Sequence, residues 1–330
     1  MKTCIIYKTE GGRAIAERIA ASLEGTTILP LEEKVALQLS HAWHEFDGII
    51  CVMAAGIVVR SIAQLIKDKL TDPCLIVLDQ EGRHVISLLS GHLGGGNALA
   101  LKVAEITGGT AVITTASDVL GKTALDLWAK RNSLSVDSKD KLTRASAKMV
   151  NEGSVTIFST LALDFLPADI VRYDERDTAD IVVTINKYMT SNALCCIPRI
   201  LYIGVGCNRG TGVNDIAESF GELCDAHDIN PNAVAGLASV DVKHDEEGIL
   251  AFAESIGLKP DFFSRDQLNG VKDVSFSAAA MKAVGVQGVA EPAALLAAQA
   301  DGSEAELIVR KMKWKDVTLA VAERKKNRWE

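Results

Sequence analysis

A single histidine, His92, lies inside a glycine-rich segment, residues 91–97, which an apolar run precedes and a helical pattern follows. Glycines allow a bound group to approach the backbone closely, and unpaired N–H groups at the start of a helix attract anions. The pattern therefore predicts a strand, a ligand-binding turn and a helix. It also fits a turn in which His92 has a purely structural role.

The imidazole of His92 has an ordinary pKa near neutrality, so we expect it to act as a general base on water. Arg60, on a helix predicted after Gly56, would add a charged donor from the same edge of a sheet. We therefore predict His92 and Arg60 as catalytic residues. The residues of the turn predicted to bind the ligand are Ser90, Gly91, Gly94, Gly95, Gly96 and Asn97.

A second glycine-rich turn, residues 204–212, also lies between a strand-like run and a helical pattern. Its spacing differs from Gly-x-Gly-x-x-Gly, and Asp215 comes too early to hold a ribose, so no nicotinamide cofactor is expected. Arg209 would grip a ligand carboxylate and Thr211 would cap the helix, although a capped helix with a solvated arginine fits equally well. The ligand-binding residues predicted in this part of the chain are Gly206, Cys207, Arg209, Thr211 and Glu291.

Other polar residues indicate a functional site less clearly. Glu291 stands before Pro292 at a predicted helix start, where a capping role is favoured over a catalytic one. His41 and His44 lie one helical turn apart, but they lack the further ligands of a known metal motif. We therefore predict no metal site in the protein.

The composition is that of an ordinary globular protein, with 330 residues, 48% of them hydrophobic, and a formal net charge of −8. This length allows two or three domains. The acidic balance argues against nucleic-acid binding and a polybasic membrane anchor, and no apolar run approaches the length that spans a bilayer. Seven cysteines, without Cys-x-x-Cys spacing, do not form a disulfide framework. Without a signal peptide, a cytoplasmic location is expected.

Strand-like runs alternate with helical patterns through the first part of the chain, beginning with apolar runs at residues 3–7, 48–53 and 74–79. Such alternation predicts a mostly parallel sheet with helices on both faces. Ligands bind at the carboxyl ends of the strands in such sheets. We therefore expect residues 54–56, Asp79 and the turn of His92 to meet at one edge.

The chain is expected to form a multi-domain α/β protein. Residues 1–136 would form the parallel α/β domain, residues 137–198 a small central α/β domain that links its neighbours, and residues 199–330 an α/β domain with a mixed sheet. Two runs near the end, residues 307–313 and 317–322, predict an antiparallel hairpin in that last domain.

The runs at residues 56–60, 85–97 and 112–116 resemble the amino-terminal domain of the cobalt-precorrin-5A hydrolase family. Residues 204–211 and 288–295 look like the carboxy-terminal domain of the same family, which also occurs alone as a small cobalamin-pathway protein. The middle segment fits the variable central domain in position and length. The family turn commonly carries a basic residue at the position of Asn208, so Arg209 is the sole guanidinium there.

This resemblance implies an enzyme of anaerobic cobalamin biosynthesis that acts on a cobalt-containing macrocycle. Water would open a δ-lactone on ring A, and a two-carbon fragment would leave as acetaldehyde to give cobalt-precorrin-5B. The cobalt belongs to the substrate, so no cofactor of the protein is implied. Transient contact with the methyltransferases of neighbouring steps is a further implication.

With that substrate, His92 would be the base, the N–H groups of its turn would bind an oxyanion or a carboxylate, and Arg60 and Arg209 would clamp carboxylates. We expect the first and third segments to face each other across a cleft that both turns line. A second hypothesis is a carrier that holds an unstable corrinoid intermediate without catalysis. A nucleotide-binding enzyme that uses the turn at Gly204 is a third.

Overall fold

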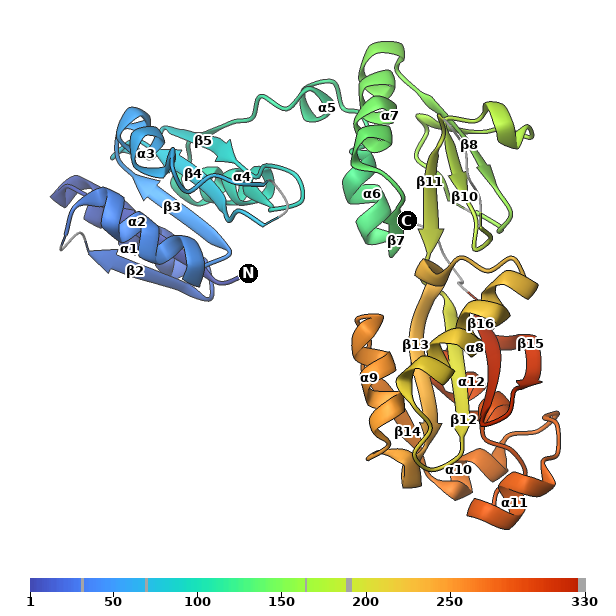
Figure 1. Ribbon diagram of the computed structural model, residues 1–330. Helices are drawn as coiled ribbons and strands as arrows, with labels where there is room; N and C mark the ends of the chain where they lie inside the picture. The colour runs from blue at the N-terminus through green and yellow to red at the C-terminus, as the bar shows by residue number, and fades with distance from the viewer. Residues whose placement is uncertain (31–32, 69–70, 164, 188–191, 326–330) are drawn as a thin grey trace. The chain divides into compact units, whose positions relative to one another are not determined.

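A computed structural model describes residues 1–330 except 31–32, 69–70, 164, 188–191 and 326–330 (Figure 1). Three sheets, one of six strands and two of five, alternate with helices, which confirms the multi-domain α/β fold. The chain divides into two compact units: Met1–Leu127 with Met149–Gly153, and Trp128–Lys148 with Ser154–Glu330. The boundary expected at residue 136 falls at the end of a strand of the second sheet, and the three-domain division stays a prediction.

The first unit contains the six-stranded sheet, in the order β2-β1-β3-β4-β5-β6. Strands β1 to β4 run parallel, β5 runs antiparallel to β4, and β6 runs parallel to β5. The strands are β1 (Thr3–Tyr7), β2 (Thr26–Pro30), β3 (Gly48–Val52), β4 (Cys74–Leu78), β5 (His84–Leu89) and β6 (Thr110–Val112). The helices that follow them are α1 (Glu10–Ser22), α2 (Val35–Glu45), α3 (Ala55–Ile62), α4 (Gly96–Thr107) and α5 (Ala116–Val119).

Helices cover both faces of this sheet because successive residues of a strand point to opposite sides. In β1, Ile5 packs in one core with residues of α1 and α4, such as Ile19 and Val103. Its neighbour Ile6 packs in a separate core with residues of α2 and α3, such as Trp43. Because their residues pack into one core or the other, these strands appear in the sequence as continuous apolar runs.

The reversal of β5 moves the turn of His92 away from the edge expected for it. Strand β5 follows β4 after a tight turn, in which the amide of Gly82 donates to the carbonyl of Asp79 and the Asp79 carboxylate accepts further amides. The end of β5 therefore lies beside the beginning of β4, with Leu89 opposite Leu75. The expectation that residues 54–56, Asp79 and the His92 turn share an edge was wrong.

The second unit contains the other two sheets. The first strand of the middle sheet lies in the chain between the helices α6 (Leu125–Arg131) and α7 (Lys139–Glu152), and the other strands follow α7. The middle sheet has the order β7-β11-β10-β8-β9. Its strands are β7 (Leu134–Val136), β8 (Val155–Ser159), β9 (Ile170–Arg172), β10 (Ile181–Val183) and β11 (Leu194–Pro198).

The last sheet, in the order β14-β13-β12-β16-β15, is mixed as expected, and the terminal hairpin is confirmed. Its strands are β12 (Leu201–Cys207), β13 (Val234–Val240), β14 (Pro260–Phe263), β15 (Ala305–Lys313) and β16 (Val317–Arg324). Around them lie α8 (Val213–Ala226), α9 (Glu247–Ser255), α10 (Arg265–Gly270), α11 (Ala278–Val284) and α12 (Ala290–Ala298).

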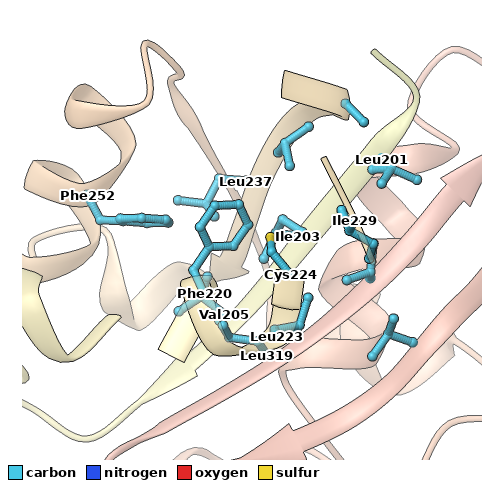
Figure 2. Close-up of a cluster of buried hydrophobic side chains, with 14 of the residues drawn as sticks. Leu201, Ile203, Val205, Phe220, Leu223, Cys224, Ile229, Leu237, Phe252 and Leu319 are labelled. Carbon is cyan, nitrogen blue, oxygen red and sulfur yellow. The ribbon is translucent and has the colours of Figure 1, made fainter. Parts of the chain in front are cut away.

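A hydrophobic core fills one face of this sheet, where Ile203, Val205 and Leu319 meet the aromatic rings of Phe220 and Phe252 (Figure 2). The two rings pack edge to face with centroids 5.4 Å apart. On the other face, α12 lies so close to β12 that a Cβ at Gly204 would collide with the carbonyl of Ala290. Gly204 is therefore required for helix packing, whatever its turn binds.

Candidate active site

His92 lies at the centre of a polar cluster in the first unit. Its Nε2 atom is 2.8 Å from Oδ2 of Asp118 and 3.2 Å from the hydroxyl of Ser117. Its Nδ1 atom is 3.6 Å from Oδ2 of Asp126. Asn97 donates from Nδ2 to the same Asp118 oxygen at 2.9 Å. The imidazole thus stands between two carboxylates, one on each ring nitrogen.

Parallel strands β5 and β6 bring these residues together. The His92 turn follows β5, and the segment with Ser117 and Asp118 follows β6, so both leave the sheet at the carboxyl ends of neighbouring strands. The sequence analysis did not assign Asp118 or Asp126. Asp118 follows shortly after the strand-like run at residues 110–114, and that position could have indicated a functional residue at the carboxyl end of a strand.

The glycines of the turn make room for the protein's own side chains. A Cβ at Gly91 would lie 2.6 Å from Oδ1 of Asn97, and one at Gly94 would lie 2.5 Å from Cβ of Ser90. Ser90 itself has a φ of 53° and Gly95 a φ of 85°, both in the left-handed region. The turn is therefore tightly folded around Asn97, which in turn contacts Asp118.

Several amides expected to bind a ligand anion already have partners. The amide of Gly95 donates to the carbonyl of His92 at 2.9 Å, that of Gly96 to Ser90 at 3.1 Å, and that of Asn97 to Gly91 at 2.9 Å. The Ser90 hydroxyl donates to the carbonyl of Asp72 at 3.1 Å. These groups hold the turn in shape, so an oxyanion would have to be met by His92 or by other amides.

The two carboxylates raise the pKa of His92 to about 9, with Asp126 as the largest cause and Asp118 adding to it, while burial works in the opposite direction. At neutral pH the imidazole is therefore protonated, donates from Nε2 to Asp118 and forms an ion pair with Asp126. The expected role of His92 as a general base stays a prediction, which a pKa of about 9 disfavours at neutral pH. A protonated imidazole is instead a proton donor and an electrophile, and the exposed Asp118 is the neighbouring acceptor.

The catalytic role expected of Arg60 stays a prediction. It lies in the last turn of α3 with an exposed side chain. Among the contacts of the described residues, none joins Arg60 to the His92 cluster. The structure thus brings together His92 and Asn97 from the predicted set and leaves Arg60 apart.

In the second unit, the turn at residues 206–209 lines a cavity of about 850 Å³. Gly206, Cys207 and Arg209 line it, as do Phe276 and most residues of the hairpin segment 311–318, whereas Thr211 and Glu291 do not. Burial raises the pKa of the Cys207 thiol, which therefore faces the cavity as a neutral group. Basic side chains dominate the lining: Arg209, Lys243, Arg265, Lys311, Lys313 and Lys315 accompany one acid, Asp316.

Arg209 is already paired with the protein's own carboxylates. Its Nη1 atom lies 2.6 Å from Asp245 and 3.5 Å from the buried Glu246, and Nη2 donates to the carbonyl of Val242. A ligand carboxylate would compete with Asp245 for this exposed guanidinium. The two-bond grip expected of Arg209 therefore stays a prediction.

Thr211 and Glu291 have structural contacts. The hydroxyl of Thr211 donates to the carbonyl of Asn208, and Gly212, not Thr211, occupies the N-cap of α8, so the expected cap was wrong. Glu291 is 2% exposed and accepts hydrogen bonds from the amide and hydroxyl of Ser275 and from the amide of Lys311. Both residues shape the walls of the cavity.

Among the described residues, no group of three or more His, Cys, Asp or Glu side chains is arranged to hold a metal ion. No described helix combines the length and the apolar character needed to cross a membrane.

Two protein-family models that match this chain define the class of protein. The family model "Cobalamin synthesis G N-terminal" matches residues 38–118, and "Cobalamin synthesis G C-terminus" matches residues 201–322. The two matched segments contain the His92 turn and the Arg209 turn, and the first ends at Asp118. The chain is thus of the cobalamin-synthesis class that these two models describe.

Two curated relatives identify the family to which the chain belongs. Cobalt-precorrin-5A hydrolase of Priestia megaterium is 34% identical over 308 residues, which cover 87% of this chain and 81% of that protein. The enzyme of the same name from Salmonella typhimurium is 30% identical over 317 residues, covering 88% and 90%. The chain belongs to the cobalt-precorrin-5A hydrolase family, as its sequence resemblance indicated, and is a hydrolase.

Solved structures are also similar. A cobalamin biosynthesis protein G homolog from Sulfolobus solfataricus is 20% identical and covers 98% of this chain and 97% of its own, with a TM-score of 0.40. CobE, a protein from the cobalamin biosynthetic pathway, is 29% identical with a TM-score of 0.37 and covers 39% of this chain and 95% of its own.

Proposed function

We propose that this protein hydrolyses cobalt-precorrin-5A, opens the δ-lactone on ring A and releases acetaldehyde to give cobalt-precorrin-5B. The observation that carries the proposal is the pairing of His92 with Asp118, within a chain 34% identical to a curated cobalt-precorrin-5A hydrolase. An acid and an acceptor in contact are the two groups that lactone hydrolysis requires.

In the proposed reaction, Asp118 accepts a proton from water as the water adds to the lactone carbonyl. The protonated His92 stabilises the oxyanion that forms and supplies a proton as the carbon–oxygen bond of the lactone breaks. The resulting alcohol loses its proton and becomes acetaldehyde when its carbon–carbon bond to the macrocycle breaks. The macrocycle carbon takes up the proton, so that water is the only co-reactant.

The second part of the proposal assigns the cavity of the second unit to substrate binding. A precorrin is a flat macrocycle with many peripheral carboxylates, and the cavity combines six basic side chains with the ring of Phe276. Such a lining favours an anionic, conjugated ligand. Cobalt would enter as part of the substrate, and no cofactor held by the protein is proposed.

We further propose a cytoplasmic location and transient contact with the methyltransferases of neighbouring steps, as the family resemblance implies. Neither a nucleic acid nor a membrane is a proposed partner. The cleft expected between the first and third segments stays a prediction.

Incubation of the full-length protein with cobalt-precorrin-5A, followed by trapping of acetaldehyde, tests the proposed activity. Stoichiometric acetaldehyde supports a hydrolase. Tight binding of the corrinoid without acetaldehyde would instead favour the carrier hypothesis. A nucleotide thermal-shift assay on the same protein is expected to show no change, because the turn at Gly204 lacks the spacing of a nucleotide loop.

A further inference from the structure

A β-bulge interrupts the terminal hairpin next to the basic cavity. Val309 of β15 lies opposite Val321 of β16, and Met312 lies opposite Leu319. Three steps along β15 thus match two steps along β16, which leaves one extra residue at positions 310–311. A second shift lies between Leu307 and Val309. One extra residue changes which face the following side chains occupy and a second one restores it, because side chains alternate along a strand.

Three lysines lie on the cavity side of the hairpin. Met312 and Trp314 pack against the hydrophobic core of Figure 2. Lys311 and Lys313, the residues on either side of Met312, line the cavity together with Lys315, and Trp314 borders both. Because side chains alternate along a strand, the packing of Met312 on the core directs its two lysine neighbours to the opposite face.

Glu291 holds this bulge in place. Its Oε1 atom accepts the amide of Lys311 at 2.8 Å, the backbone group that the bulge removes from regular pairing. The same carboxylate accepts the amide of Ser275 at 2.6 Å and its hydroxyl at 2.9 Å. Because Ser275 precedes Phe276, one buried carboxylate fixes both the lysine strand and the aromatic wall of the cavity.

The lysine side chains are available to a ligand. In the described part of the chain, Lys313 and Lys315 have no carboxylate partner within ion-pair distance, and Lys311 donates only weakly to the carbonyl of Phe276 at 3.4 Å. The one acid of the cavity, Asp316, accepts a hydrogen bond from Asn208 at 2.8 Å. Phe276 is 65% exposed beside them. Free ammonium groups thus border an exposed aromatic ring.

We propose that Lys311, Lys313 and Lys315 form the carboxylate-binding edge of the cavity, and that Glu291 is the positioning residue that directs them there. The ligand class is a flat, conjugated polycarboxylate. Lys311 and Lys313 are alternate residues of β15 and lie about 6.5–7 Å apart along the strand, a spacing that lets them meet separate peripheral carboxylates, and Lys315 follows in the turn. The identity of that ligand as a precorrin rests on the proposed function, whereas the carboxylate-binding edge does not.

Binding of uroporphyrin, a stable porphyrin with eight carboxylates, tests the proposal in the full-length protein. Its octamethyl ester, which has no charged carboxylate, is the matched ligand. We expect the triple variant Lys311→Gln, Lys313→Gln, Lys315→Gln to weaken uroporphyrin binding about tenfold and to lose most of its salt dependence. The ester should bind weakly to every variant.

The matched control carries the same change of charge at exposed lysines outside the cavity: Lys8→Gln, Lys102→Gln and Lys259→Gln. It should bind uroporphyrin as the wild type does. Wild-type affinity in the cavity variant, or equal affinity of the wild type for the ester and the free acid, would overturn the proposal. A loss of affinity in the control as large as in the cavity variant would do so as well.

The variant Glu291→Gln tests the positioning role. We expect about tenfold weaker uroporphyrin binding and a higher KM for cobalt-precorrin-5A with an unchanged kcat, since the residue acts through the lysines. Unchanged uroporphyrin binding in a folded Glu291→Gln variant would contradict that role. If the wild type binds uroporphyrin through the lysines but releases no acetaldehyde from cobalt-precorrin-5A, the proposed function fails and the carboxylate-binding edge stands.

Discussion

His92 Nε2 and Asp118 Oδ2 lie 2.8 Å apart although 26 residues separate them in the sequence. Each residue follows one of two neighbouring parallel strands, β5 and β6, so the sheet itself brings them to one edge. Together with Asp126, which is the larger cause, this contact raises the pKa of His92 to about 9, so the imidazole is protonated at neutral pH.

The pH dependence of activity separates the two possible roles of His92. Because its pKa is about 9 in the folded protein, a role as proton donor predicts that kcat/KM falls as the pH rises through about 9. A role as general base predicts the opposite, a rise over the same range. A pH profile of acetaldehyde release from cobalt-precorrin-5A distinguishes them.

The same pKa predicts a pH dependence of stability. The folded-state pKa of about 9 lies above the ordinary value of 6.5, so the stabilisation is fully present below the ordinary value and is lost as the pH rises through about 9. We expect about 1–2 kcal/mol, because the imidazole is partly exposed. Urea unfolding at about pH 6 and about pH 10 measures it. An equal loss in the His92→Asn variant would show that other groups cause the change.

Asp118→Asn should lower the pKa of His92 and remove the proposed acceptor of the water proton. We expect kcat to fall about 100-fold or more with a smaller change in KM, since a general acid–base residue contributes on that order. Asp174→Asn, which makes the same change at an exposed aspartate outside the His92 cluster and the basic cavity, serves as the comparison. Activity near the wild-type level in Asp118→Asn would rule out its assigned role.

Gly91→Ala tests the turn itself. The new Cβ would lie 2.6 Å from Oδ1 of Asn97, so the amide side chain must move away from its contact with Asp118. We expect a loss of about 1–3 kcal/mol of stability together with lower activity. Gly221→Ala has no atom near its new Cβ and no positive φ, so it shows the effect of a glycine-to-alanine change without a clash. Thermal unfolding and acetaldehyde release of both variants give the comparison.

The buried Glu291 carboxylate predicts acid sensitivity. Its pKa is lowered because the hydrogen bonds from Lys311 and Ser275 and the nearby Arg310 outweigh burial, which acts in the opposite direction. Its stabilisation is therefore present above the ordinary glutamate pKa and is lost as the pH falls through the lower folded-state value. Glu291→Gln should be less stable at neutral pH and should lose less stability on acidification. Parallel unfolding curves of variant and wild type at every pH would contradict this.

The alternation of strands and helices made the α/β fold predictable, because buried parallel strands appear as continuous apolar runs. The direction of β5 was misjudged, since hydrophobic periodicity says nothing about direction. The length of the connection between β4 and β5 indicates the direction of β5. Its five residues, 79–83, are too few for a parallel crossover, which needs a dozen or more.

The candidate site was predictable in part. The glycine-rich turn marked His92 and Asn97, but the partners that change the pKa of His92 lie elsewhere in the sequence, in Asp118 and Asp126. The lysines of the cavity were not predicted, because alternation separates Lys311 and Lys313 from Met312 but does not show which face of the hairpin borders a cavity. Glu291 was predicted to bind the ligand or to cap a helix. It lies outside the lining of the cavity, and its carboxylate accepts hydrogen bonds from Ser275 and Lys311.

Acetaldehyde release from cobalt-precorrin-5A by the wild type and by His92→Gln tests the central claim most directly. Equal binding of the corrinoid by both proteins is the control for folding. The wild type should release one equivalent of acetaldehyde, and the variant should do so at a rate lower by about 100-fold or more. No acetaldehyde from the wild type, or an unchanged rate in the variant, would contradict a hydrolase that uses His92 as its proton donor.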